Sequence, residues 1–457
     1  MTLPVILLAV AALARLLLQI LAMPPYAGLD ELYHLGRVVF AQNEGRQPRI
    51  DELSLPAQLA RAGGGGDGVP PSFSTLGERW VARNTWPNPP VNRDDTYVAT
   101  NYEAQQPSLW YVVASWMPAR TMLGQLLALR FLNVLCGLVV IFATMRLGTP
   151  ATAALLVCVP TWLVLIARAS NDGLACALMA IGMLAPFALP FAIAVKGYAA
   201  PLLILPLFRA ERRRQLVVFA VVTAIVVAVV MLDLQRRSGS AVGLQQFGAH
   251  GEGKISVAEG IKVFIASFAW PGGQHGNALR PIAIIVFLAP LLAAIAFAFK
   301  RSDRKAMVAT AVAAFLGAQA VHAIGFARSG MIGGFEGWYV YALAPLVFGL
   351  LFKRLPPRAL VALGLWLLLW DVAIHEGGIF RDYGGLTTAT PGTIFRWSGA
   401  WFSLGDYGRG GLFPQLPWGA LFALRVVHVV STVTLLVRAE KGFLPPFWKN
   451  TGTDPSL

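Results

Sequence analysis

Apolar runs of about twenty residues recur along this chain, and they constrain its fold more than any other feature. The first run is Leu3–Ala22, and another clear one is Leu127–Leu147. An α-helix of that length spans the hydrocarbon core of a bilayer, and a helix satisfies its own backbone hydrogen bonds in lipid. Only 13% of the 457 residues are charged, whereas soluble domains have about 25%. The sequence therefore predicts an all-α polytopic membrane protein.

About 12 segments, within a range of about 10 to 13, are candidate crossings. They are Leu3–Ala22, Leu127–Leu147, Ala151–Arg168, Asp172–Leu184, Phe187–Val195, Tyr198–Phe208, Leu216–Leu234, Pro281–Phe299, Met307–Phe326, Trp338–Phe352, Ala359–Ile374 and Trp418–Val437. Residues 172–208 are compatible with two ordinary helices or three short ones. Three short helices put every clear basic cluster on one face, which the positive-inside rule identifies as cytoplasmic. We therefore favour three.

The crossings and the polar segments between them predict one integral membrane domain over residues 1–457 with large outward loops. Residues 23–126 form the first of these loops, with helices along the membrane interface, and residues 375–417 form a late one. Pro107–Met122 is apolar but short, which indicates an interfacial or re-entrant helix. The net charge of +14 comes from short basic clusters between apolar runs, so it does not indicate nucleic acid as a partner.

The segment that follows the first apolar run carries the first candidate site. Asp30 and Glu31 are adjacent carboxylates, and His34 and Arg37 follow them. One interpretation is a solvated helix start, because acidic residues favour a helix N-terminus and aspartate is a good N-cap. The other is a general base at the membrane interface, where both a lipid and a polar substrate can reach it.

Further polar groups interrupt apolar segments later in the chain. Each group has a structural interpretation as an aromatic belt, a helix-end ion pair or a snorkelling lysine, and a functional one as part of a substrate site. The groups are Tyr102, Glu103, Gln105 and Gln106; Arg168, Asn171 and Asp172; Lys196 and Tyr198; and Glu336, Trp338 and Tyr339. No pair of histidines has metal-ligand spacing, so no metal is indicated, and the three cysteines predict no disulfide framework.

Five short motifs resemble segments of the GT-C superfamily of membrane glycosyltransferases, family 39 type, which includes protein O-mannosyltransferases and lipid A aminoarabinose transferases. They are GLDELYHLGR, NYEAQQPSLWY, RASND, VKGYAAPL and EGWYVYALAPL, in the family's order over residues 20–350. Three positions depart from the family's motifs. Gln105 stands where a histidine is usual, Ser108 where a second proline is usual, and Trp338 where an arginine is usual.

The resemblance implies a GT-C fold and an inverting glycosyltransferase that moves a hexosyl or pentosyl group from a polyprenyl phosphate donor. The acceptor would be a lipid, a glycan or a protein, and the site would face the periplasm from a bacterial inner membrane in the cell envelope. No cofactor is implied, and a divalent metal is left open.

Roles are carried over from the resemblance residue by residue. Asp30 would be the base or the carboxylate that orients the acceptor, supported by Glu31, and Asp172 would be the second carboxylate. Lys196, Arg37 and Arg168 would neutralise the leaving phosphate, because such a transfer is catalysed mainly by stabilising the developing charge. The other polar groups named above would bind substrate.

Two other functions use the same features. A transporter or flippase of a polyprenyl-linked glycan would share the charges but break no bond; against it, no inverted repeat is visible. A glycan ligase or polymerase would favour a larger late loop than residues 375–417.

The basic clusters generate a topology prediction. A cysteine placed at Gly64, in a protein whose native cysteines are replaced, should react with an impermeant reagent added from outside, and one at Arg212 should not. Labelling at Arg212 without labelling at Gly64 would invert the topology.

Overall fold

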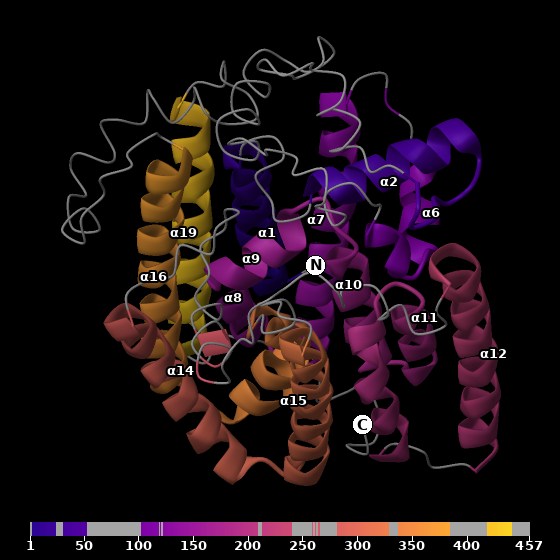
Figure 1. Ribbon diagram of the computed structural model, residues 1–457. Coiled ribbons are helices and arrows are strands. Elements are labelled where there is room, and N and C mark those ends of the chain that lie inside the picture. Colours follow the sequence, from indigo (N-terminus) through magenta and orange to yellow (C-terminus); the bar gives the residue numbers. More distant parts are fainter. Residues whose placement is uncertain are drawn as a thin grey trace.

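The computed structural model describes residues 2–23, 31–52, 102–117, 119, 122–208, 213–239, 281–328, 337–383 and 418–440, together with a few isolated positions between 258 and 265. Every regular element within these ranges is a helix (Figure 1). The predicted all-α polytopic architecture is therefore confirmed, and each predicted crossing segment contains helix.

Long helices form the frame of the protein. They are α1 (Leu3–Ala22), α7 (Met122–Leu147), α12 (Arg213–Ser238), α14 (Pro281–Arg301), α15 (Lys305–Arg328), α16 (Pro357–Tyr383) and α19 (Trp418–Glu440). Among the residues that the structure describes, five helices are long and apolar enough to cross a membrane, or six if one bent pair counts as a span. The count of about 12 crossings stays a prediction, since the other segments are shorter or only partly described.

The predicted single crossing Ala151–Arg168 is wrong in its geometry. Two helices occupy it, α8 (Pro150–Val157) and α9 (Pro160–Ala167), and the chain bends by 79° between them. Pro160 causes the break, because proline lacks a backbone N–H and disfavours helical geometry in the residue before it. Val159 accordingly has an extended backbone, with φ −98° and ψ 103°. Every residue of α9 is buried, so protein rather than lipid surrounds the break.

Residues 172–208 fold as short helices, as the charge pattern predicted. The elements are α10 (Asp172–Gly182), η3 (Pro186–Ala188), α11 (Leu189–Ile193) and η4 (Gly197–Phe208). The last is a 3₁₀-helix of 12 residues with Pro201 and Pro206 inside it. Such runs rarely exceed 3–4 residues, and packing against α15 and α11 accompanies this long one.

The segments that the sequence predicts to be outward loops contribute further short helices. In the first loop these are α2 (Glu31–Glu44), η2 (Tyr102–Gln105) and α6 (Leu109–Ser115), so the helix predicted over Pro107–Met122 is shorter than expected. The predicted crossing Trp338–Phe352 is a chain of η5 (Gly337–Leu343), the π-helix η6 (Pro345–Leu351) and η7 (Phe352–Arg354). Helix α16 runs to Tyr383, into the predicted late loop.

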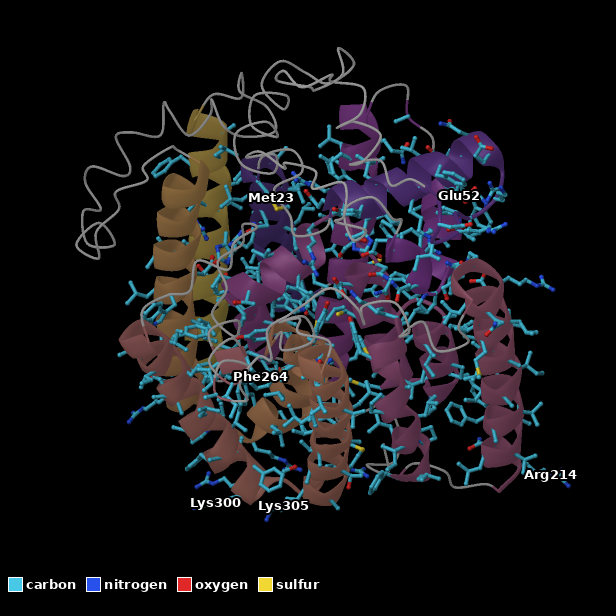
Figure 2. The ribbon with its side chains drawn as sticks, in the orientation of Figure 1. Met23, Glu52, Arg214, Phe264, Lys300 and Lys305 are labelled. Atoms are coloured by element: carbon cyan, nitrogen blue, oxygen red, sulfur yellow. The ribbon has the colours of Figure 1, made fainter. Side chains whose placement is uncertain are left out.

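The two ends of the helical bundle differ in charge. Figure 2 shows Arg214, Lys300 and Lys305 at one end and Met23 and Glu52 at the other. This is the relative arrangement that the topology prediction requires. The first and last long helices, α1 and α19, lie side by side next to α16, and α12 stands at the far side of the bundle (Figure 1).

A buried ionic cluster joins the three helices α1, α16 and α19. The guanidinium of Arg15 donates to both oxygens of Asp371, at 2.8 and 2.7 Å, and to Gln19 at 3.0 Å. Arg425 donates to the same carboxylate from α19. None of the three charged side chains is more than 4% exposed. Apolar packing alone does not orient helices in lipid, so this cluster fixes their register.

This cluster predicts a large loss of stability in Asp371→Asn. The substitution leaves two buried arginines without their counter-ion, and removing one partner of a buried ion pair costs about 3–5 kcal/mol. Asp303→Asn is the matched control. The Asp303 carboxylate also pairs with an arginine, Arg354, but it is 64% exposed, and exposed pairs contribute about 0–1 kcal/mol. Thermal unfolding in detergent measures both; equal melting temperatures would contradict the prediction.

Candidate functional site

The site is organised around an ion pair between Glu31 and Arg130, both fully buried. Arg130 lies on α7 and donates from Nε and Nη2 to the two carboxylate oxygens of Glu31, at 2.9 and 2.7 Å. Its Nη1 donates to the carbonyl oxygens of Ile20 and Met23, at 3.1 and 2.6 Å. These carbonyls belong to the end of α1, where the helix leaves carbonyls without intrahelical partners. One arginine therefore holds the end of α1 and the start of α2 together.

The same carboxylate links the first loop to a distant part of the chain. Glu31 Oε1 also accepts from the backbone N–H of Ala169 at 2.8 Å, across 138 residues. Asn133 on α7 holds that segment too, donating to the carbonyls of Arg168 and Ser170. The Asp-Glu motif and the RASND motif are thereby brought into contact. Because three donors bind its two oxygens, Glu31 is suited to positioning its neighbours rather than to taking up a proton.

Asp172 lies at the start of α10 between two cations. Arg168 and Lys196 both donate to it, from opposite oxygens. The hydroxyl of Ser170 adds a third bond at 3.1 Å, and that of Tyr198 lies 3.5 Å away. All of these side chains except Tyr198 are buried. Within the described residues, Asp172 is thus bound by two buried cations, and ionisable groups buried in a membrane protein are candidates for a functional site.

Aromatic rings surround the ammonium group of Lys196. Its Nζ lies 5.0 Å from the centroid of the Tyr339 ring and 5.6 Å from that of Tyr198. Cations within about 6 Å of a ring face are attracted to it. Tyr198 comes from η4 and Tyr339 from η5, so the structure brings the Lys-Gly motif and the Gly-Trp-Tyr motif together, although they are far apart in sequence.

His34, Tyr111 and Glu103 form a buried chain of hydrogen bonds. His34 Nδ1 lies 2.7 Å from the hydroxyl of Tyr111, which lies 2.5 Å from Glu103 Oε2. Burial, followed by the positive charge of Lys196, lowers the pKa of His34 well below 6.5, so the imidazole is neutral at pH 7. Burial also raises the pKa of Tyr111.

Arg37 connects this chain to the polar segment that precedes α6. Its guanidinium lies 3.6 Å from the centroid of the Tyr111 ring and donates to the carbonyls of Glu103 and Gln106. Burial lowers the pKa of Arg37 to about 9, which still leaves it charged at pH 7. Arg237 of α12 donates to the same Gln106 carbonyl at 3.0 Å. Two arginines from separate helices thus hold the segment in place.

Two of the predicted binding residues keep a buried oxygen without a hydrogen-bond partner within the described ranges. They are Gln105 Oε1 and Asn171 Oδ1. The amide nitrogen of Asn171 is occupied, since it donates to the carbonyl of Val195 at 3.2 Å. Buried acceptors are rarely left unpaired, so each of these oxygens is suited to a bound water or a ligand hydroxyl.

The sequence-predicted residues divide into two sets. Those that the structure brings together are Glu31, His34, Arg37, Glu103, Gln105, Gln106, Arg168, Asn171, Asp172, Lys196, Tyr198 and Tyr339. Asp30 and Glu336 lie outside the described residues, as do the side chains of Tyr102 and Trp338.

Sequence reasoning missed the partners that orient these residues. The sequence places Arg130 and Asn133 in an apolar crossing, Tyr111 in an aromatic belt, and Arg237 in the loop after the crossing Leu216–Leu234, whereas the structure continues α12 to Ser238. The one available signal was the presence of Arg130 and Asn133 inside a membrane-spanning run, because polar residues there face protein and find partners. Within the described residues, no group of three histidine, cysteine or acidic side chains is arranged to hold a metal.

Comparison with known proteins gives one structural likeness. No protein-family model matches the chain, and no curated protein matches it significantly. A crystal structure of ArnT from Cupriavidus metallidurans bound to undecaprenyl phosphate superposes with a TM-score of 0.48 and 17% sequence identity, covering 96% of this chain and 77% of that one. At this level of likeness, the activity of this protein has to be argued from its own residues.

The neutral state of His34 predicts a pH dependence of stability. The unfolded chain binds a proton at this histidine near pH 6.5 and the folded protein does not, so stability falls as the pH drops below that value. The cost is about 1.4 kcal/mol for each further pH unit. His34→Gln should flatten the fall in melting temperature between pH 7 and 5.5, since all other titrating groups are shared. Parallel profiles for the parent and the variant would show that His34 binds its proton in both states.

Proposed function

We propose that this protein is an inverting glycosyltransferase of the GT-C type, which moves a sugar from a polyprenyl phosphate donor to an acceptor at the outer face of the membrane. The observation that carries the proposal is the hydrogen bond from Ala169 to Glu31. It joins the segment that contains Asp30 to the segment that holds the two cations around Asp172. A proton acceptor and a phosphate-binding group are thereby supplied from opposite ends of the same site.

The charges around Asp172 suit a leaving phosphate. Lys196 and Arg168 place two buried cations side by side, and their burial makes these charges act through a medium of lower dielectric constant than water. Phosphate that departs from the sugar carries developing negative charge, so fixed cations at this position lower the barrier. Arginine and lysine serve differently here. The guanidinium is planar and directional, whereas the ammonium is a compact point charge.

The proposed role of Asp30 comes from the sequence motif that it shares with Glu31. Glu31 itself is held by Arg130 and by the backbone N–H of Ala169. In this proposal Asp30 is the base or the carboxylate that orients the acceptor, and Glu31 and Asp172 are positioning carboxylates. The donor tail lies in the bilayer, and the polar residues from Glu103 to Gln106 bind the sugar or the acceptor.

Asp30→Asn tests the proposal, because a cap and a catalytic carboxylate make different demands. Asparagine caps a helix about as well as aspartate, so stability should change little. A proton acceptor is lost, so turnover should fall by roughly two to four orders of magnitude. The assay follows radiolabelled sugar from undecaprenyl phosphate sugars into the lipid, glycan and protein fractions of membrane vesicles that contain the protein.

Asp51→Asn is the matched control in the first loop. Within the described residues Asp51 pairs with Arg49, and its side chain is 63% exposed, so its replacement should leave the rate unchanged. Near-parental transfer by Asp30→Asn would make Asp30 a helix cap. If the parent protein moves intact glycolipid across the vesicle membrane and never breaks the sugar–phosphate bond, the protein is a flippase instead.

A further inference from the structure

A chain of three titratable side chains leads away from the site through the protein. His34 comes from α2, Tyr111 from α6 and Glu103 from η2, and each is at most 3% exposed. The two links measure 2.7 Å from His34 Nδ1 to the Tyr111 oxygen and 2.5 Å from that oxygen to Glu103 Oε2. Both lengths are those of normal to strong hydrogen bonds. A binding role for each residue separately does not require this continuity.

Counting protons sets the direction of the chain. An ionised Glu103 can only accept, and Tyr111 has one hydroxyl proton, so that proton points to Glu103. The Tyr111 oxygen must then accept from His34, which makes Nδ1 the protonated nitrogen of the neutral imidazole. The second ring nitrogen, Nε2, consequently carries a lone pair and is the basic atom of the ring.

The surroundings keep that nitrogen unprotonated before the reaction. The charged groups that face His34 are Lys196, Arg168 and Arg37, which disfavour the imidazolium, and Asp172, which favours it. Burial acts in the same direction as the three cations. Glu103 Oε2 lies 3.3 Å from His34 Nδ1 as well as 2.5 Å from the Tyr111 oxygen, so the three side chains form a compact cluster. Because the imidazolium is disfavoured, a proton that arrives at Nε2 is followed by transfer of the Nδ1 proton toward Glu103, through Tyr111 or directly.

We propose that His34, Tyr111 and Glu103 are a proton relay that takes up the proton of the acceptor hydroxyl. This inference rests on the proposed function and adds the fate of the proton, with Asp30 as the carboxylate that orients the acceptor. The acceptor oxygen forms a bond to the anomeric carbon while its proton passes to His34 Nε2. The bond from that carbon to the phosphate oxygen breaks, and its electron pair leaves with the phosphate. The Nδ1 proton moves to Tyr111 and the Tyr111 proton moves to Glu103, so one proton ends on Glu103.

Arg37 gives the relay its rigidity. Its guanidinium covers the face of Tyr111 and donates to the backbone carbonyl of Glu103. Both contacts survive if the Tyr111 hydroxyl is deleted or if the Glu103 carboxylate becomes an amide. The relay can therefore be cut at two points without removing the ring or the backbone contact that holds it.

The test uses Glu103→Gln and Tyr111→Phe in the vesicle assay described above. Glutamine still accepts a hydrogen bond from Tyr111 but cannot take its proton, so turnover should fall about 100-fold with little change in KM for the donor. Phenylalanine removes the hydroxyl and leaves only the longer direct contact from His34 Nδ1 to Glu103, so turnover should fall about 10-fold. The double variant should be no slower than Glu103→Gln alone, because residues that act as one unit are not additive.

Tyr341→Phe is the matched control for deleting a buried tyrosine hydroxyl. Tyr341 lies on η5, is 6% exposed and is not part of the relay, so its variant should transfer sugar at the parental rate. Near-parental turnover in both Glu103→Gln and Tyr111→Phe, with Asp30→Asn inactive, would overturn the relay and leave the proposed function standing. Independent, additive losses in the double variant would also overturn it.

A readout without activity separates the relay from the proposed function. In protein labelled with ¹⁵N-histidine, the ring nitrogens of His34 should report a protonated Nδ1 and a bare Nε2 at pH 7.5, and His34→Gln identifies the signal. Tyr111→Phe should weaken the preference for this tautomer, because it removes the nearer of the two acceptors beside Nδ1. An Nε2-protonated tautomer in the parent would overturn the relay even if sugar transfer is observed. The expected tautomer without any sugar transfer would overturn the proposed function instead.

Discussion

The buried ion pair between Arg130 and Glu31 is the interaction on which the site depends. Removing a carboxylate and a guanidinium from water costs several kcal/mol per ion, and the pair is fully buried. The cost is offset only where the geometry is good and the remaining donors are used, and here Arg130 makes hydrogen bonds of 2.6–3.1 Å both to the end of α1 and to Glu31. Replacing either partner would leave the other as a buried charge without its counter-ion. It would also remove contacts that join the end of α1, the start of α2 and the segment around Ala169.

A second ionic cluster supports the same helix from the other side. Arg15 is one turn before Gln19 on α1, and both contribute to the cluster around Asp371. The carbonyls of Ile20 and Met23, bound by Arg130, follow on the same helix. Helix α1 is thus held directly by polar contacts to Asp371 of α16 and to Arg130 of α7, and through them it is linked to α19 and α2. In lipid, where apolar surfaces gain little by meeting one another, such contacts determine how helices are placed.

Most carboxylates of the site are occupied by the structure itself. Glu31 and Asp172 each accept several hydrogen bonds and serve to position other groups. The sequence suggests a catalytic role for both carboxylates, whereas their hydrogen bonds favour a positioning role. Carboxylates that look alike in sequence differ chemically once their partners differ. The chemical step then falls to side chains that keep an atom available for the substrate.

The sequence by itself determined the class of the protein and predicted many of the polar residues that the structure brings together. Runs of apolar residues specify membrane helices because lipid offers the backbone no hydrogen bonds, and polar residues at their ends are candidates for function. The tertiary structure alone decided the 79° break between α8 and α9, the contact from Ala169 to Glu31, and the choice of Arg130 and Tyr111 as partners. These depend on which segments meet in space, as Ala169 and Glu31 do across 138 residues, or on how neighbouring protein shields a broken helix from lipid, and local patterns contain neither.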